Sequence, residues 1–161
     1  MMHDQHHQQD PQDPAQLNAL VRSATIHCLT GCGIGEVLGM VIGSALGLSN
    51  LMTVIIAITL AFIFGYSLTM RPLLKSGVSF PMAAKLALAA DTASITIMEI
   101  VDNLIMLVIP GAMDAHVLSW RFWISLALAL TLAGIAAFPV NRWLIKRGRG
   151  HALVHSHHNH S

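Results

Sequence analysis

The sequence predicts an all-α, polytopic membrane protein with four transmembrane helices and both termini in the cytoplasm. Hydrophobic residues make up 54% of the chain and charged residues only 11%. A soluble domain of this size needs more charge to cover its surface. The apolar residues gather in four segments, each long enough to cross a hydrocarbon core of about 30 Å.

We expect the spans at residues 25–48, 51–70, 83–109 and 120–143. The first connection, Ser49-Asn50, is so short that the first two helices should form an antiparallel hairpin. The second connection includes Pro72 and Pro81, which predict that no continuous helix passes through it. Pro139 near the end of the fourth span predicts a kink.

The basic residues set the expected orientation. With four spans, Arg121 is the single exception among the nine Lys and Arg residues, and the others fall on the side of the termini. The positive-inside rule places that side in the cytoplasm. Residues 1–16 are polar and have no basic segment ahead of an apolar run, so we expect no signal peptide.

Two histidine-bearing tails flank the predicted transmembrane domain, residues 17–147. The N-terminal tail, residues 1–16, is expected to be disordered without a partner, and the C-terminal tail covers 148–161. The tails hold all but two of the ten histidines. Imidazole binds copper, zinc and nickel, which favours metal capture over a merely solubilising role. The candidate residues are His3, His6, His7, His155, His157, His158 and His160.

A glycine ridge runs along the first span. Its members recur every fourth residue, on one side of a helix: Gly31, Gly35, Gly39, Gly43 and Gly47. Each glycine costs about 1 kcal/mol of helix propensity against alanine. Small residues at this spacing are typical of close contact between membrane helices. The contact could lie within the chain or between copies in a dimer or larger oligomer, and the pattern leaves both open.

Acidic residues lie on one face of the third span: Asp91, Glu99 and Asp102. Glu36 lies within the first span. A charged residue at the centre of a bilayer costs about 2.5–3.5 kcal/mol, and no Lys or Arg lies in the middle of any span to neutralise it. We expect these acids to face inward and to be protonated, paired or bound to a cation. Alternatively, they hydrogen-bond across helices to Asn103, Thr92, Ser94, Thr53 or Thr59.

A cysteine pair lies one turn apart on the side of the first span that carries Glu36. Thiolates such as Cys28 and Cys32 can hold one Cu(I) ion or supply half of a Zn(II) site. Cysteine is also a common packing residue, so the pair alone is weak evidence. His27 points about 100° away from Cys28 and is either a ligand or an interfacial residue. Met98 could add a thioether beside the acids.

The leading hypothesis is that a transition metal, Cu(I) or Zn(II), is bound and moved across the membrane. Cys28, Cys32 and Glu36 would face Glu99 and Asp102, with the lipid bilayer around them. Because four spans enclose little room, we expect a homo-oligomer, a dimer or larger, to form the transport path. The alternatives are an accessory protein that assembles a membrane metalloenzyme with a partner membrane protein, and a proton or monovalent-cation pathway. The chain has no catalytic motif, Walker loop or dinucleotide fingerprint, so we expect no enzyme and no nucleotide or organic cofactor. It also lacks a nucleic-acid-binding pattern.

Two blocks of the sequence carry a family resemblance. Residues 27–36 read HCLTGCGIGE, and residues 91–103 read DTASITIMEIVDN. Together they resemble a bacterial membrane family known as domain of unknown function 4396, over roughly residues 24–147. The resemblance implies a small multi-span protein of the bacterial inner membrane. It implies no activity, so the functional reading depends on the residues above.

Overall fold

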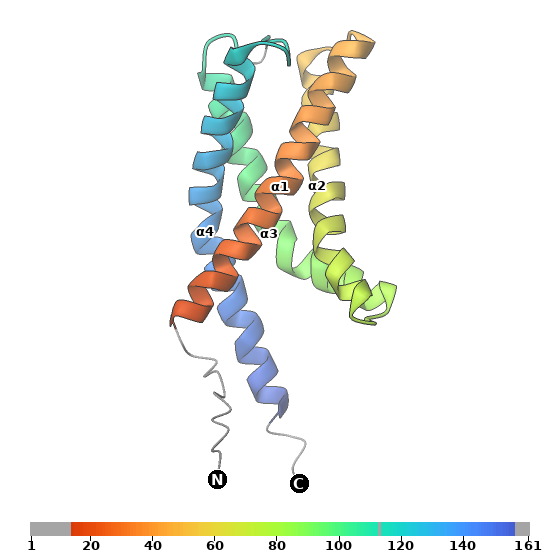
Figure 1. The fold of residues 1–161 in the computed structure, drawn as a ribbon, viewed down its shortest axis with the longest axis vertical. Coiled ribbons are helices and arrows are strands. Elements are labelled where there is room, and N and C mark those ends of the chain that lie inside the picture. The colour runs from red at the N-terminus through yellow and green to blue at the C-terminus, as the bar shows by residue number, and fades with distance from the viewer. Residues whose placement is uncertain (1–13, 113, 157–161) are drawn as a thin grey trace, which may run out of the picture.

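The computed structural model describes residues 14–112 and 114–156, and this part of the chain is all helix and turn (Figure 1). The helices are α1, Pro14–Leu46; α2, Asn50–Lys75; α3, Phe80–Val108; and α4, Trp120–Ser156. The predicted all-α class is confirmed. Six of the tail histidines lie outside the described residues: His3, His6, His7, His157, His158 and His160. His155 lies in the last turn of α4, where only the backbone is described.

The helices run alternately up and down, so the beginning of α1 and the end of α4 lie at the same end of the molecule (Figure 1). Around the bundle, α1 contacts α2 and α4, and α3 contacts the same two helices. Across its centre α1 also contacts α3, whereas the described parts of α2 and α4 make no contact. The diagonal pair α1 and α3 therefore forms the interior.

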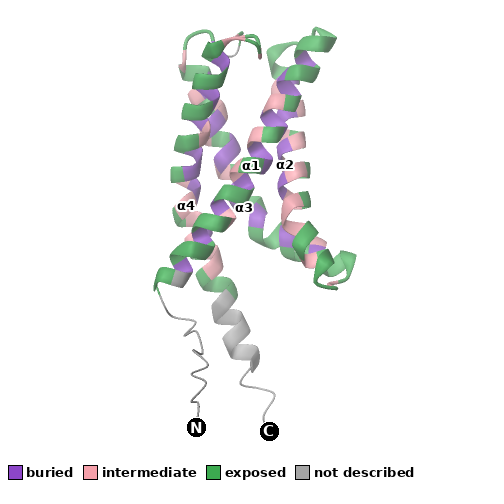
Figure 2. Ribbon diagram, in the orientation of Figure 1, coloured by how far each residue is buried: buried purple, intermediate pink, exposed green. Residues whose placement is uncertain are grey.

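Exposed residues lie on the outside of the bundle, and buried residues face its inside (Figure 2). Large hydrophobic residues are well exposed on every helix, including Leu46, Ile63, Leu107 and Ile135. Within the part of the chain that the structure describes, three helices are long and apolar enough to cross a membrane: Leu17–Leu46, Asn50–Lys75 and Trp120–Gly148. An outer surface of this kind fits lipid better than water.

Three helices extend beyond the spans expected from the sequence. α1 begins at Pro14, ahead of the span expected from residue 25, and proline is well tolerated in the first turn of a helix. α2 continues through Pro72 to Lys75, so this proline does not end the helix. The break comes at Gly77, whose φ of 86° favours glycine. α4 continues through Pro139 to Ser156 instead of ending at residue 143.

The glycine ridge packs inside the chain, against α2. Its members face small residues at a matching spacing: Gly31 against Gly65, Gly35 against Ala61, Gly39 against Ala57 and Gly43 against Thr53. A Cβ atom added to Gly35 would lie 2.2 Å from the backbone nitrogen of Ala61. The contact left open by the sequence is thus internal for these four glycines. Gly47 is different, because its φ of 61° lets the chain turn after α1.

Candidate functional site

A column of thiols and carboxyls lies between α1 and α3, at the centre of the bundle. We call these six residues the acid–thiol column: Cys28, Cys32 and Glu36 from α1, and Asp91, Glu99 and Asp102 from α3. Their exposed fractions are all between 2% and 7%. The four-residue spacing on α1 stacks its three side chains on one side of the helix. α3 presents its acids at positions one and two turns apart, so the two sets meet along the diagonal contact.

The column has three levels along the helix axes. At the end nearest the termini, Cys28 Sγ donates to Asp91 Oδ1 at 3.9 Å. In the middle, Cys32 interacts with Glu99. Beyond them, Glu36 interacts with Asp102 and, more weakly, with Glu99. Carboxyl and thiol groups therefore succeed one another along the interior of the bundle.

Several carboxyl oxygens of the column have no hydrogen-bond partner in the described protein. They are Asp91 Oδ2, Glu99 Oε2 and both oxygens of Asp102, and the hydroxyl of Ser94 is also unpaired. A buried polar group without a partner costs about 1–3 kcal/mol by protein mutational data. Only binding of a proton, a cation or water would compensate for this cost.

The polar residues considered as hydrogen-bond partners of the acids are engaged elsewhere. Asn103 donates to the backbone carbonyl of Glu99 at 2.9 Å rather than to a carboxyl oxygen. Thr92 and Thr59 each donate to a carbonyl one turn earlier in their own helix. Thr53 packs against Gly43. None of these four residues therefore makes a described hydrogen bond to a carboxyl of the column, and the fifth candidate, Ser94, is unpaired.

Each end of the column leads toward a hollow. Asp91 lines a groove of about 420 Å³ between α1, α3 and α4, beside Ala24 and Asn141. At the other end, Met40 follows Glu36 by one turn and lines a small hollow of about 100 Å³. Polar groups of that hollow come from Ser44, Asn50 and Thr53. Asp91 is buried but borders the open space of the groove.

The other predicted ligands lie around the column. His27 is exposed and donates from Nδ1 to the carbonyl of Ser23 at 3.1 Å, although it still interacts electrostatically with Asp91. Met98 is fully buried in a cluster that contains both cysteines. Both thiols are free. Over residues 14–112 and 114–148, whose side chains are described with the exception of Gln16, no three His, Cys, Asp or Glu residues are grouped to hold one metal ion.

A buried polar contact between α1 and α4 was not predicted from the sequence. Asn141 of α4 donates from Nδ2 to Thr25 Oγ1 of α1 at 2.9 Å, and both side chains are buried. Thr25 in turn donates to the carbonyl of Val21. The contact joins α1 to α4 beside the groove that Asp91 lines. The only signal in the sequence was an isolated asparagine in an apolar segment.

Comparison with known proteins identifies one family. The pattern of the family described as a domain of unknown function (DUF4396) matches residues 18–150. This match covers α1, α2, α3 and most of α4, including all six residues of the acid–thiol column. No curated protein and no solved structure matches the chain.

Proposed function

The chain belongs to the domain of unknown function family DUF4396, and we propose that it moves a cation across a bacterial inner membrane through the acid–thiol column. The favoured cation is the proton. One observation carries the proposal: Asp91 Oδ2, Glu99 Oε2 and both carboxyl oxygens of Asp102 are buried and have no hydrogen-bond partner in the described part of the chain. Acids inside a helical membrane bundle are functional by default, and chains of them form proton relays.

The proposal makes α3 the fourth span. With 29 residues it reaches about 43 Å, more than a hydrocarbon core requires. Its acids face α1 and not lipid, which lowers the cost of placing them in the membrane. Arg22, Lys85, Arg142 and Lys146 belong to the end of the bundle where α1 begins, and the positive-inside rule puts that end in the cytoplasm.

Each level of the column has a role in this pathway. Asp91 exchanges protons with water in the groove at the cytoplasmic end. Glu99 passes the proton between the levels, and Glu36 and Asp102 share it before release toward the opposite hollow. A proton enters at one end for each proton that leaves at the other, so no redox partner is required. The thiols of Cys28 and Cys32 serve as neutral hydrogen-bond donors.

Replacing Glu99, the acid at the middle level of the column, should strongly reduce proton flux. We expect vesicles containing the full-length protein to acidify when a potassium diffusion potential, negative inside, drives protons inward. Glu99→Gln should lower the rate on the order of 100-fold, because proton relay through this level is lost. An internal pH-sensitive dye measures the rate.

The matched control is Asp114→Asn, which removes an exposed acid that accepts a hydrogen bond from Asn50 outside the column. This variant should conduct like the wild type. Equal acidification rates for the wild type, Glu99→Gln and protein-free vesicles would contradict the proposed proton pathway.

The second candidate is a soft metal ion, as the sequence suggested. The observation that favours it is the pair of buried free thiols on one side of α1, with the thioether of Met98 in the same cluster. Two thiolates suffice for near-linear Cu(I), whereas a structural Zn(II) site usually takes four donors. Cu(I) therefore fits the pair better than Zn(II).

Metal analysis separates the two candidates. Full-length protein with its tail histidines replaced by glutamine, purified reduced and without nickel, should retain no stoichiometric copper after exposure to Cu(I) if the proton is the cargo. One copper per chain that disappears in Cys28→Ser/Cys32→Ser would favour the metal. The same double variant should leave proton flux within about twofold of the wild type if the thiols only donate hydrogen bonds.

A further inference from the structure

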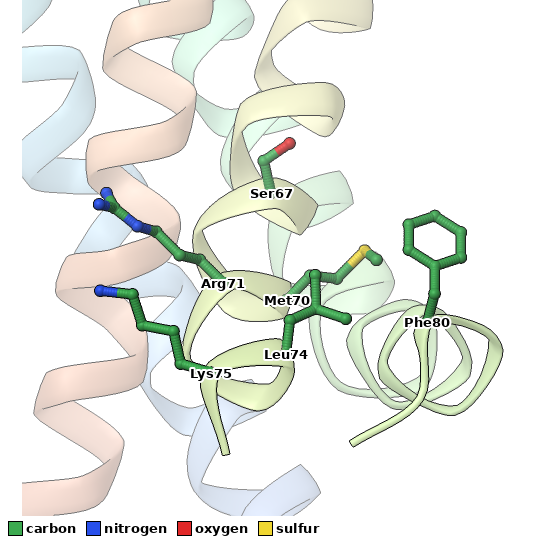
Figure 3. Close-up of a pocket in the computed structure, with 6 residues that line it drawn as sticks. All are labelled: Ser67, Met70, Arg71, Leu74, Lys75 and Phe80. Atoms are coloured by element: carbon green, nitrogen blue, oxygen red, sulfur yellow. The ribbon is translucent and has the colours of Figure 1, made fainter. Parts of the chain in front are cut away.

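A groove with both basic and apolar walls lies where α2 ends and α3 begins (Figure 3). It has a volume of about 570 Å³ and is lined by Ser67, Met70, Arg71, Leu74, Lys75 and Phe80. These residues are separate from the acid–thiol column, and the proposed function does not use them. The groove opens on the surface of the bundle, where all six side chains are exposed or half-buried.

The lining separates into a polar and an apolar side. Arg71 and Lys75 lie one turn apart on α2 and extend in the same direction (Figure 3). Met70 and Leu74 form the adjoining row one position earlier, and Phe80 stands across from them at the start of α3. The groove is thus bordered by two cationic side chains, whose charged ends extend away from Phe80, and on its other side by apolar side chains (Figure 3).

The depth of the groove matches the headgroup layer of a bilayer. α2 has 26 residues and is about 39 Å long, whereas a hydrocarbon core is about 30 Å thick. The last turns of α2, which carry Arg71 and Lys75, therefore extend beyond the hydrocarbon. Met70 and Phe80 lie at the depth where the acyl chains join the headgroups.

The charges of the groove call for an anionic ligand. Two cations and no acid are among its lining residues. A guanidinium binds phosphate oxygens in a bidentate manner, and an ammonium group one turn away can neutralise a further charge. Basic pockets between membrane helices bind anionic headgroups on the cytoplasmic side.

We propose that this groove binds the headgroup of an anionic phospholipid, with Arg71 and Lys75 on the phosphate and Met70, Leu74 and Phe80 against the upper acyl chain. The site would fix the turn between α2 and α3 at the membrane surface. It depends on α2 crossing the membrane but not on the transport activity of the column.

The test measures lipid affinity in detergent with the full-length protein. Phosphatidylglycerol is titrated, and the thermal unfolding temperature is followed, with phosphatidylcholine as the zwitterionic comparison and soluble glycerol phosphate as the chain-free one. Phosphatidylglycerol should raise the unfolding temperature of the wild type, and the other two should not. Arg71→Gln/Lys75→Gln should weaken the phosphatidylglycerol effect by roughly 10- to 30-fold in concentration, because each basic residue near the surface contributes.

The matched control is Arg142→Gln/Lys146→Gln, which removes two positive charges from α4 at the same end of the bundle. It should shift the titration by less than about threefold if the groove is a specific site. An equal loss in both double variants would overturn the proposal in favour of general surface charge. A phosphatidylcholine effect equal to that of phosphatidylglycerol, or an equal effect of glycerol phosphate, would also overturn it.

Discussion

Gly35→Ala is expected to lower the free energy of unfolding by about 3 kcal/mol, the upper part of the usual range for overpacked sites. The new Cβ would lie 2.2 Å from the Ala61 nitrogen and 2.4 Å from its Cα. Both are backbone atoms, so α1 and α2 must move apart. Alanine is otherwise the better helix former by about 1 kcal/mol, so a loss of stability reports the contact and not helix propensity.

Gly33→Ala is the matched control for this substitution. Its Cβ would meet only Leu130 Cδ1, at 3.2 Å, and the end of a leucine side chain can shift. We expect a change within about 1 kcal/mol of the wild type. Denaturant unfolding in detergent, followed by circular dichroism, measures both variants. Equal effects at the two positions would contradict the close α1–α2 packing.

Asp102→Leu is expected to make the protein more stable. Asp102 is 2% exposed, and neither carboxyl oxygen has a partner in the described protein. An apolar side chain of similar shape removes this unpaired polar group, which should raise the free energy of unfolding by about 1–3 kcal/mol. A residue kept for packing alone would give the opposite sign, because replacing it would disturb a fitted site.

Thr96→Val serves as the comparison for Asp102→Leu on the same helix. Thr96 is exposed and donates only to the carbonyl of Thr92, one turn earlier. Replacing its hydroxyl should change the free energy of unfolding by no more than about 0.5 kcal/mol. A loss of stability in Asp102→Leu, measured beside Thr96→Val, would contradict an unpaired buried carboxyl and would mean that the Asp102 side chain is fitted to its site or has a stabilising partner.

The sequence predicted the helical class and the inward-facing acids because both follow from the cost of polar groups in an apolar medium. The partner of the glycine ridge could not be predicted, because small residues allow close approach equally well within a chain or between chains. The structure places Gly35 against Ala61, so the ridge packs within the chain. Helix ends such as Lys75 depend on single hydrogen bonds, which composition does not resolve.

Part of the candidate site could also be predicted from the sequence. Spacing placed Cys28, Cys32 and Glu36 on one side of a helix, but their opposition to particular acids depends on how α1 crosses α3. The contact between Thr25 and Asn141 joins residues far apart in the sequence, and no local pattern marks it. Whether any of these residues binds a metal stays a prediction from the sequence.

The most direct test of the acid–thiol column is proton flux through Asp102→Leu, measured in the same vesicles and at the same protein density as the wild type. This variant is expected to be more stable, so a loss of flux cannot come from unfolding. Our account predicts that the wild type conducts and that Asp102→Leu falls to the rate of protein-free vesicles. Undiminished flux in Asp102→Leu, or no flux in the wild type, would contradict proton transfer along the column.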